Sequence, residues 1–199
     1  MTTPSEALSL AFQYILEAGN NLEGAAESQF SGANRHNAVS FLNDRTGRRQ
    51  LIKERLEAAR ELLTLLEQEC PDATAAVTLE TGEEITLTVP LVSMVCYRTE
   101  SNVMFRCYDD LTAARTLIEH AIAIDPSDSL NHALHGSLCS DLKEFPAAIA
   151  SMERAILLDP ADMNYKLALN DIRRKQESFV AEQAAKPQRS KWNPRSWLS

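Results

Sequence analysis

Apolar residues recur at helical spacing along most of this chain. Near the start, Leu8, Phe12 and Ile15 lie three or four residues apart and predict an amphipathic helix over residues 5–18, with Ser5 as its cap. A second series runs from residue 39 to residue 70, but the polar residues 43–47 interrupt it, so one long helix and a helix pair both fit. The polar stretch 19–37 predicts a loosely ordered connection, although residues 22–29 could extend the first helix.

Residues 74–89 follow a different pattern, in which apolar and polar residues alternate. Val77 and Leu79 precede a turn at Thr81-Gly82, and Ile85 and Leu87 follow it. Period-two alternation of β-branched residues around a glycine turn predicts a β-hairpin with one apolar face. A hairpin alone is marginal in water, so this face is expected to dock on helices or on a partner.

The stretch from residue 111 to residue 160 contains one pattern twice. Leu111–Pro126 reads LTAARTLIEHAIAIDP, and Phe145–Pro160 reads FPAAIASMERAILLDP, at an offset of 34 residues. The aligned pairs include Ala114 with Ala148, Ala121 with Ala155, and Pro126 with Pro160. Self-similarity at a fixed offset predicts stacked helical units rather than one globular core.

This pattern resembles the tetratricopeptide repeat (TPR), a family of antiparallel helix pairs. The second copy has the small residues and the proline of the family at Gly136, Ala148, Ala155 and Pro160, whereas His132, His135 and Cys139 replace large apolar residues. The preceding copy has Asn102 where Gly is usual. An earlier copy is degenerate, because Gly47 and Ala59 fit but Leu66 replaces a small residue.

The resemblance implies a mainly α fold in which helix pairs form a right-handed superhelix, with the hairpin as an insertion. The expected order is an N-terminal helix and polar connection (1–38), a degenerate first repeat (39–72), the hairpin insertion (73–93), repeats at 94–128 and 129–161, a capping helix (162–185) and a basic disordered tail (186–199).

Composition and charge narrow the class of protein. A hydrophobic content of 44% and a charged content of 24% over 199 residues are typical of a soluble domain. No basic leader and no long apolar run is present, which predicts a cytoplasmic protein without a membrane span. The four cysteines lack metal-like spacing and are expected to be reduced thiols. The net charge is −8 and the tail carries +4, so the rest carries −12, which argues against a nucleic-acid partner.

A basic run interrupts this acidic background between residues 45 and 60. Its members are Arg45, Arg48, Arg49, Lys53, Arg55 and Arg60. They could form an anion or nucleic-acid site, but six acids lie between residues 36 and 71, and Lys53 and Glu57 are four residues apart. A solvated helix face with internal ion pairs is therefore the favoured interpretation.

Candidate chemistry is sparse. His132 and His135 lie three residues apart on one predicted helix and His120 lies on a neighbouring one, so a metal-dependent sensor or enzyme is the alternative function. His132 and His135 fall on packing positions of the repeat, and no acidic or thiol ligand has diagnostic spacing nearby. We therefore expect no enzyme activity, no cofactor and no metal site.

The resemblance implies a non-enzymatic adaptor or chaperone-like module that binds a protein partner, an amphipathic helix or extended peptide, in the concave groove of its repeats. The groove residues carried over from the family are Cys96, Thr99, Val103, Arg106, Leu130, Ala133, Ser137, Ser140, Asn164, Leu167 and Asp171. The Lys, Asn and Arg set with which some members bind C-terminal carboxylates is absent from these positions. In the tail, Trp192 and Trp197 are predicted to contact an acidic surface of the chain or of a partner. Neither the partner's identity nor the oligomeric state can be inferred from the residues.

Overall fold

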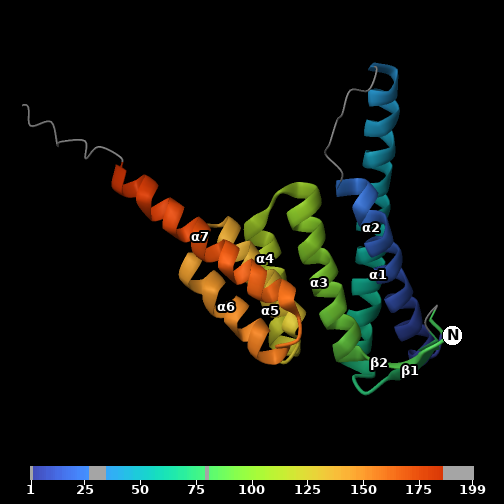
Figure 1. Cartoon of the computed structure of the whole chain (residues 1–199). Coiled ribbons are helices and arrows are strands. Elements are labelled where there is room, and N and C mark those ends of the chain that lie inside the picture. Colours follow the sequence, from blue (N-terminus) through green and yellow to red (C-terminus); the bar gives the residue numbers. More distant parts are fainter. Residues whose placement is uncertain (1, 27–34, 79–80, 186–199) are drawn as a thin grey trace, which may run out of the picture.

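A computed structural model describes the backbone of residues 2–26, 35–78 and 81–185, and the side chains of residues 2–22, 46–78 and 81–185. The described residues form seven α-helices and one two-stranded antiparallel sheet, and the helices pack as antiparallel pairs (Figure 1). In chain order the elements are α1 (Pro4–Ala26), α2 (Arg35–Glu69), β1 (Thr74–Thr78), β2 (Glu84–Thr88), α3 (Val89–Tyr108), α4 (Leu111–Ile124), α5 (Ser129–Asp141), α6 (Phe145–Leu158) and α7 (Met163–Ala185). The mainly α class is confirmed.

Helix α1 begins and ends at other residues than the sequence predicts. Thr3, not Ser5, lies at its start: the Thr3 hydroxyl accepts from the Glu6 N–H at 3.2 Å, and the Glu6 carboxylate accepts from the Thr3 N–H at 2.8 Å. These hydrogen bonds from Thr3 hold the pKa of Glu6 below its usual value. The helix continues through Gly19 because Ala18 and Leu22 extend the buried stripe of Leu8, Phe12 and Ile15, so the predicted polar connection is helical up to Ala26.

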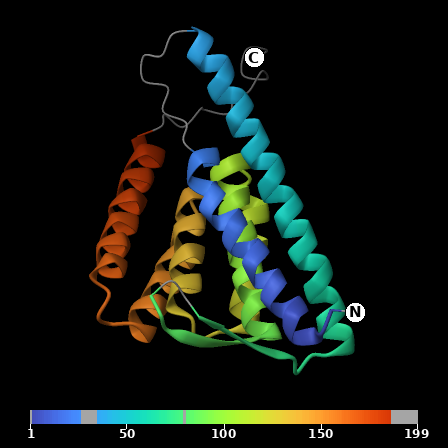
Figure 2. The same ribbon diagram turned by 90° about the vertical axis from the view of Figure 1, so that its right-hand side faces the viewer.

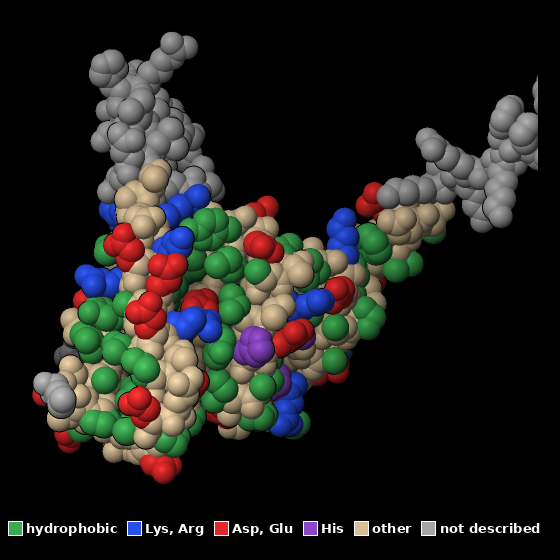
Figure 3. Space-filling model, turned by 180° about the vertical axis from the view of Figure 1, so that it is seen from behind, with side chains coloured by type: hydrophobic (Ala, Val, Ile, Leu, Met, Phe, Trp, Pro, Cys, Tyr) green, Lys and Arg blue, Asp and Glu red, His purple; other side chains and the backbone are tan. Residues whose placement is uncertain are grey.

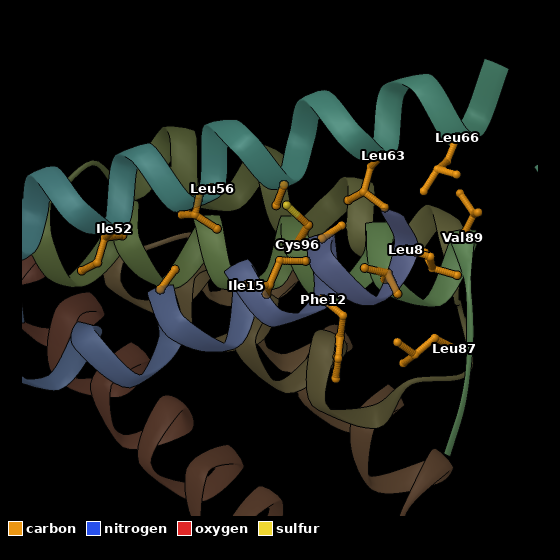
Figure 4. Close-up of a cluster of buried hydrophobic side chains, with 14 of the residues drawn as sticks. Leu8, Phe12, Ile15, Ile52, Leu56, Leu63, Leu66, Leu87, Val89 and Cys96 are labelled. Carbon is orange, nitrogen blue, oxygen red and sulfur yellow. The ribbon is translucent and has the colours of Figure 1, made fainter. Parts of the chain in front are cut away.

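Helix α2 is a single helix of 35 residues, which decides between the two alternatives for residues 39–70. Its apolar residues, including Ile52, Leu56, Leu63 and Leu66, are buried against α1 and α3, and Figure 4 shows them facing Leu8 and Ile15. Figure 2 shows α1 lying along α2 on the near side of the molecule.

The hairpin forms as predicted and closes one end of this core. Ala75 pairs with Leu87 and Val77 pairs with Ile85 across the two strands. Ala75 and Leu87 are buried, and Val77 and Ile85 pack against the same cluster, at the end of the helices where α2 stops and α3 starts (Figures 1 and 2). Leu79 lies outside the described residues.

The predicted boundary between the hairpin insertion and the next helix is shifted. Residues 89–93, which the sequence assigns to the insertion, form the first turns of α3. Thr88 caps this helix by accepting from the Leu91 N–H at 3.3 Å, and Pro90 fits the first turn because no backbone N–H is needed there. The strand therefore passes into the helix without a loop.

The pairs α3–α4 and α5–α6 depend on small residues at their contacts. Ala114, Ala121, Ala148 and Ala155 are fully buried, as predicted for Ala148 and Ala155. At Gly136 a Cβ atom would lie 3.1 Å from the Ala148 carbonyl oxygen. The two helices of this pair thus approach as closely as their backbones allow.

Helix α7 covers the open side of α5 and α6. Leu169 and Ile172 are buried with Phe145 and Met152, and Tyr165 and Phe179 pack against the same cluster. None of the helices in the described part of the chain combines the length and apolar character that crossing a membrane demands.

Candidate interaction surfaces

The predicted groove residues of α3 lie mostly inside the protein. Cys96 and Val103 are buried in the cluster formed with α1 and α2. Thr99 is half-buried and donates to the Val95 carbonyl of its own helix at 2.9 Å, and only Arg106 is exposed. Because the α1–α2 pair packs on this helix, these positions offer little surface to a partner.

The predicted groove residues of α5 and α7 divide into buried and exposed positions. Ala133 and Ser140 are buried, whereas Ser137 and Asn164 are exposed. Asp171 is half-buried and pairs with Arg174 at 3.1 Å and with Lys175 at 3.6 Å. The predicted lining is therefore not one continuous surface.

Four large apolar residues of α5 and α7 are exposed: Leu130 (44%), Met163 (60%), Leu167 (63%) and Val180 (60%). The first three lie near the starts of the two helices, and we call Leu130, Met163 and Leu167 the α5–α7 face. The two helices pack together here, since the Ser129 hydroxyl lies 3.4 Å from that of Tyr165, and Met163 and Leu167 are four residues apart on one side of α7. The sequence prediction missed Met163, although its spacing from Leu167 could have indicated it.

A pocket of about 550 Å³ lies between α2, α3 and α4, and the sequence did not predict it. We call it the α2–α4 pocket; Leu56, Val103, Met104, Tyr108 and Leu117 form its apolar part, and Lys53, Glu57, Arg60, Glu100 and Asp110 its charged part. Figure 3 shows the corresponding side of the molecule, where hydrophobic side chains gather beside α2 among charged ones. Its residues come from three helices, so no local spacing indicates it.

One wall of this pocket is fixed by an ion pair. Arg60 donates from Nε to one carboxylate oxygen of Glu100 at 2.9 Å and from Nη2 to the other, and the Glu100 side chain is only 12% exposed. This hydrogen bonding to Glu100 raises the pKa of Arg60. The guanidinium also lies 4.7 Å from the centre of the Tyr97 ring, so α2 and α3 are held together at this point.

The basic run on α2 is used largely within the chain. Lys53 lies 3.7 Å from Glu57, which confirms the predicted pair. Arg55 lies 2.8 Å from Glu17 of α1, and Arg49 lies over the Tyr108 ring of α3 at 5.5 Å. The basic run is therefore a helix face with ion pairs, as favoured from the sequence, and Arg49 and Arg55 also attach α2 to its neighbours. The Arg45 side chain lies outside the described residues.

The three histidines of the alternative function contact different partners. His120 stacks on Tyr97 with ring centres 5.3 Å apart, and His132 Nε2 lies 3.0 Å from the Pro126 carbonyl oxygen. His135 Nδ1 lies 2.8 Å from the Ser151 hydroxyl. Among the residues that the structure describes, no three His, Cys, Asp or Glu side chains are placed to hold a metal ion together.

The cysteine thiols differ in accessibility, which gives a testable prediction. All four are free; Cys96 and Cys139 are buried, and burial raises their pKa to about 12 and about 11, whereas Cys70 is half-buried. With a disulfide reagent at pH 8, Cys70 should react fast and Cys96 and Cys139 only as the protein unfolds, because the thiolate is the reactive form. Cys70→Ser should remove the fast phase, and a fast phase that persists in this variant would contradict the assignment.

The same burial predicts a dependence of stability on pH. The folded state favours the protonated thiols of Cys96 and Cys139. Their contribution to the free energy of unfolding is therefore complete below the unfolded pKa near 8.5 and is lost as the pH rises towards the folded pKa values of about 12 and about 11.

No protein-family model matches this chain, and no curated protein matches it either.

Proposed function

We propose that this chain is a non-enzymatic protein–protein interaction module, an adaptor or chaperone-like protein, in which α3–α4 and α5–α6 are two TPR-like units that stack in a right-handed sense. Support comes from the 34-residue offset of the two copies and from the buried alanines at matching positions in both. Helix α7 then serves as the cap that repeat arrays need on their last unit.

The observation that carries this proposal is the α5–α7 face. The face has three exposed large apolar side chains on two helices that are in contact, and groups of such side chains commonly mark an interaction site. Covering Leu130, Met163 and Leu167 would contribute up to about 1.5–3 kcal/mol for each side chain. The partner that fits is an amphipathic helix or extended segment with large apolar residues at regular spacing.

Charge plays a small part in this recognition. Asp171, the acidic residue among the predicted contacts, is already paired with Arg174 and Lys175. The exposed polar residues nearby, Ser137 and Asn164, are uncharged. Binding should therefore tolerate moderate salt, because screening weakens charge pairs far more than apolar contacts.

The test is affinity purification with the full chain as bait in an extract of its native host, at low and moderate salt. Wild type should retain a partner at both salt concentrations, and Leu130→Glu and Leu167→Glu should each lose it while keeping their helical circular dichroism. Leu16→Glu is the matched control, since Leu16 is 45% exposed but lies on α1. Retention by both variants of the face, or loss only with Leu16→Glu, would overturn the proposed site.

A further inference from the structure

The α2–α4 pocket and the surface that adjoins it along α2 combine an apolar interior with an acidic edge. The charged side chains around them are Lys53 and Arg60 against Glu57, Glu61, Glu100 and Asp110, a net charge of −2. Both bases are already paired, Lys53 with Glu57 and Arg60 with Glu100, which leaves Glu61 and Asp110 outside these pairs. An occupant should therefore bring an apolar group together with positive charge.

The chain's own C-terminal segment has this chemistry. Residues 186–199 contain four bases, no acid and both tryptophans of the protein. A pocket of about 550 Å³ is of the size that binds compact aromatic groups, and a tryptophan brings a large apolar ring to such a site.

A chain of side-chain contacts connects the pocket to the last turns of α7. Asp110, which lines the pocket, lies at the turn between α3 and α4. Arg115, one turn further along α4, donates at 2.6 Å to Glu144, which lies at the turn between α5 and α6. At that same turn Lys143 lies over the ring of Phe179 in α7 at 5.5 Å. The α3–α4 turn beside the pocket and the last turns of α7 thus lie at the same end of the helices, the upper end in Figure 1.

The length of the segment selects one tryptophan. The Lys143 contact is at Phe179, about 9 Å along α7 before Ala185, and from there the path crosses α5 and α4 in three helix-to-helix steps of about 8–10 Å. The distance to cover is therefore between roughly 30 and 40 Å. Trp192, seven residues beyond Ala185, reaches at most about 23 Å, and Trp197, twelve residues beyond it, reaches about 40 Å in an extended chain. Of the two tryptophans, only Trp197 can therefore reach the α2–α4 pocket.

We propose that residues 186–199 bind the α2–α4 pocket of their own chain, with the Trp197 ring against Leu56, Met104 and Leu117 and with the basic residues of the segment beside the acidic edge. Tethering makes this an intramolecular event at high effective concentration, so modest contacts suffice. The pocket of about 520 Å³ beside α7 fits less well, because Lys143, Arg174 and Lys175 balance Asp141, Asp171 and Glu182 around it.

Tryptophan fluorescence of the full chain tests this directly, because both reporters lie in the segment. In Trp192→Phe the remaining Trp197 should emit at shorter wavelength than free tryptophan and should be protected from acrylamide quenching. In Trp197→Phe the remaining Trp192 should emit like free tryptophan in water. Water-like emission from Trp197 would overturn the proposal.

Charge reversal locates the contact without touching the apolar core. In the Trp192→Phe background, the exposed Glu57→Lys and Glu61→Lys changes together should shift Trp197 emission to longer wavelength. Ser178→Lys, beside the other pocket, is the matched control and should leave emission unchanged. A response to Ser178→Lys alone would place the segment elsewhere, and emission that varies with protein concentration would indicate a second copy; either result contradicts the proposal.

Discussion

Leu87→Asp should lower the free energy of unfolding more than any other single change considered for this protein. Leu87 is fully buried in β2 opposite Ala75 and closes the end of the core formed by α1, α2 and α3. Truncating a buried leucine to alanine costs about 2–5 kcal/mol, and a carboxylate adds the penalty of placing a charge among apolar atoms. We expect a loss of more than about 4 kcal/mol, enough to unfold a protein of ordinary stability.

Urea unfolding followed by circular dichroism checks this prediction. Thr86→Asp is the matched control, since Thr86 is the neighbouring residue on the exposed side of the same strand, and its effect should stay within about 0.5 kcal/mol. The deficit of Leu87→Asp should shrink at acid pH, because protonation removes the buried charge. Equal midpoints for the two variants at pH 7 would show that the hairpin is not part of the core.

The elements that the sequence predicts well are those with a strong local pattern. The stripe of Leu8, Phe12 and Ile15 and the alternation around Thr81-Gly82 each repeat over several residues, and each identifies an element that the structure contains. The alanines at 34-residue offset likewise identify helix contacts, because only small side chains fit where helices approach closely.

The elements that the sequence predicts poorly depend on contacts between distant residues. Gly19 and Gly47 each disfavour a helix by only about 1 kcal/mol, which burial of residues such as Leu22 and Ile52 outweighs. Both helices therefore continue through their glycines. The length of α1 and α2 is fixed by their packing on one another and not by local propensity.

The same cause limits prediction of the interaction surfaces. A resemblance assigns groove positions within one repeat, but it does not reveal that α1 and α2 pack on Cys96 and Val103. The α2–α4 pocket combines residues about 60 apart in the chain, from Lys53 to Leu117, and no sequence spacing marks them as neighbours. Leu130 and Leu167 differ in this respect, because none of the described helices covers them.

Ala148→Leu should be the next most damaging substitution, at a cost of about 1–3 kcal/mol. Ala148 is fully buried between α6 and α5, where a Cβ atom at Gly136 would already lie within 3.1 Å of the Ala148 carbonyl oxygen and 3.3 Å of the Met152 nitrogen. Backbone atoms of a helix cannot move aside as the end of a flexible side chain can. The added atoms must therefore push α5 and α6 apart or take a strained rotamer.

The matched control lies two residues further along the same helix. Ala150 is exposed, and Ala150→Leu adds the same atoms to α6 with similar helix propensity, so urea midpoints of this variant and wild type should agree closely. Ala155→Leu, fully buried at the corresponding contact further along α6, should behave like Ala148→Leu. If all three variants unfold at the wild-type midpoint, small residues do not determine how these helices approach. If the two buried changes destabilise and Ala150→Leu does not, close helix contact at the repeated alanines is what the 34-residue pattern encodes.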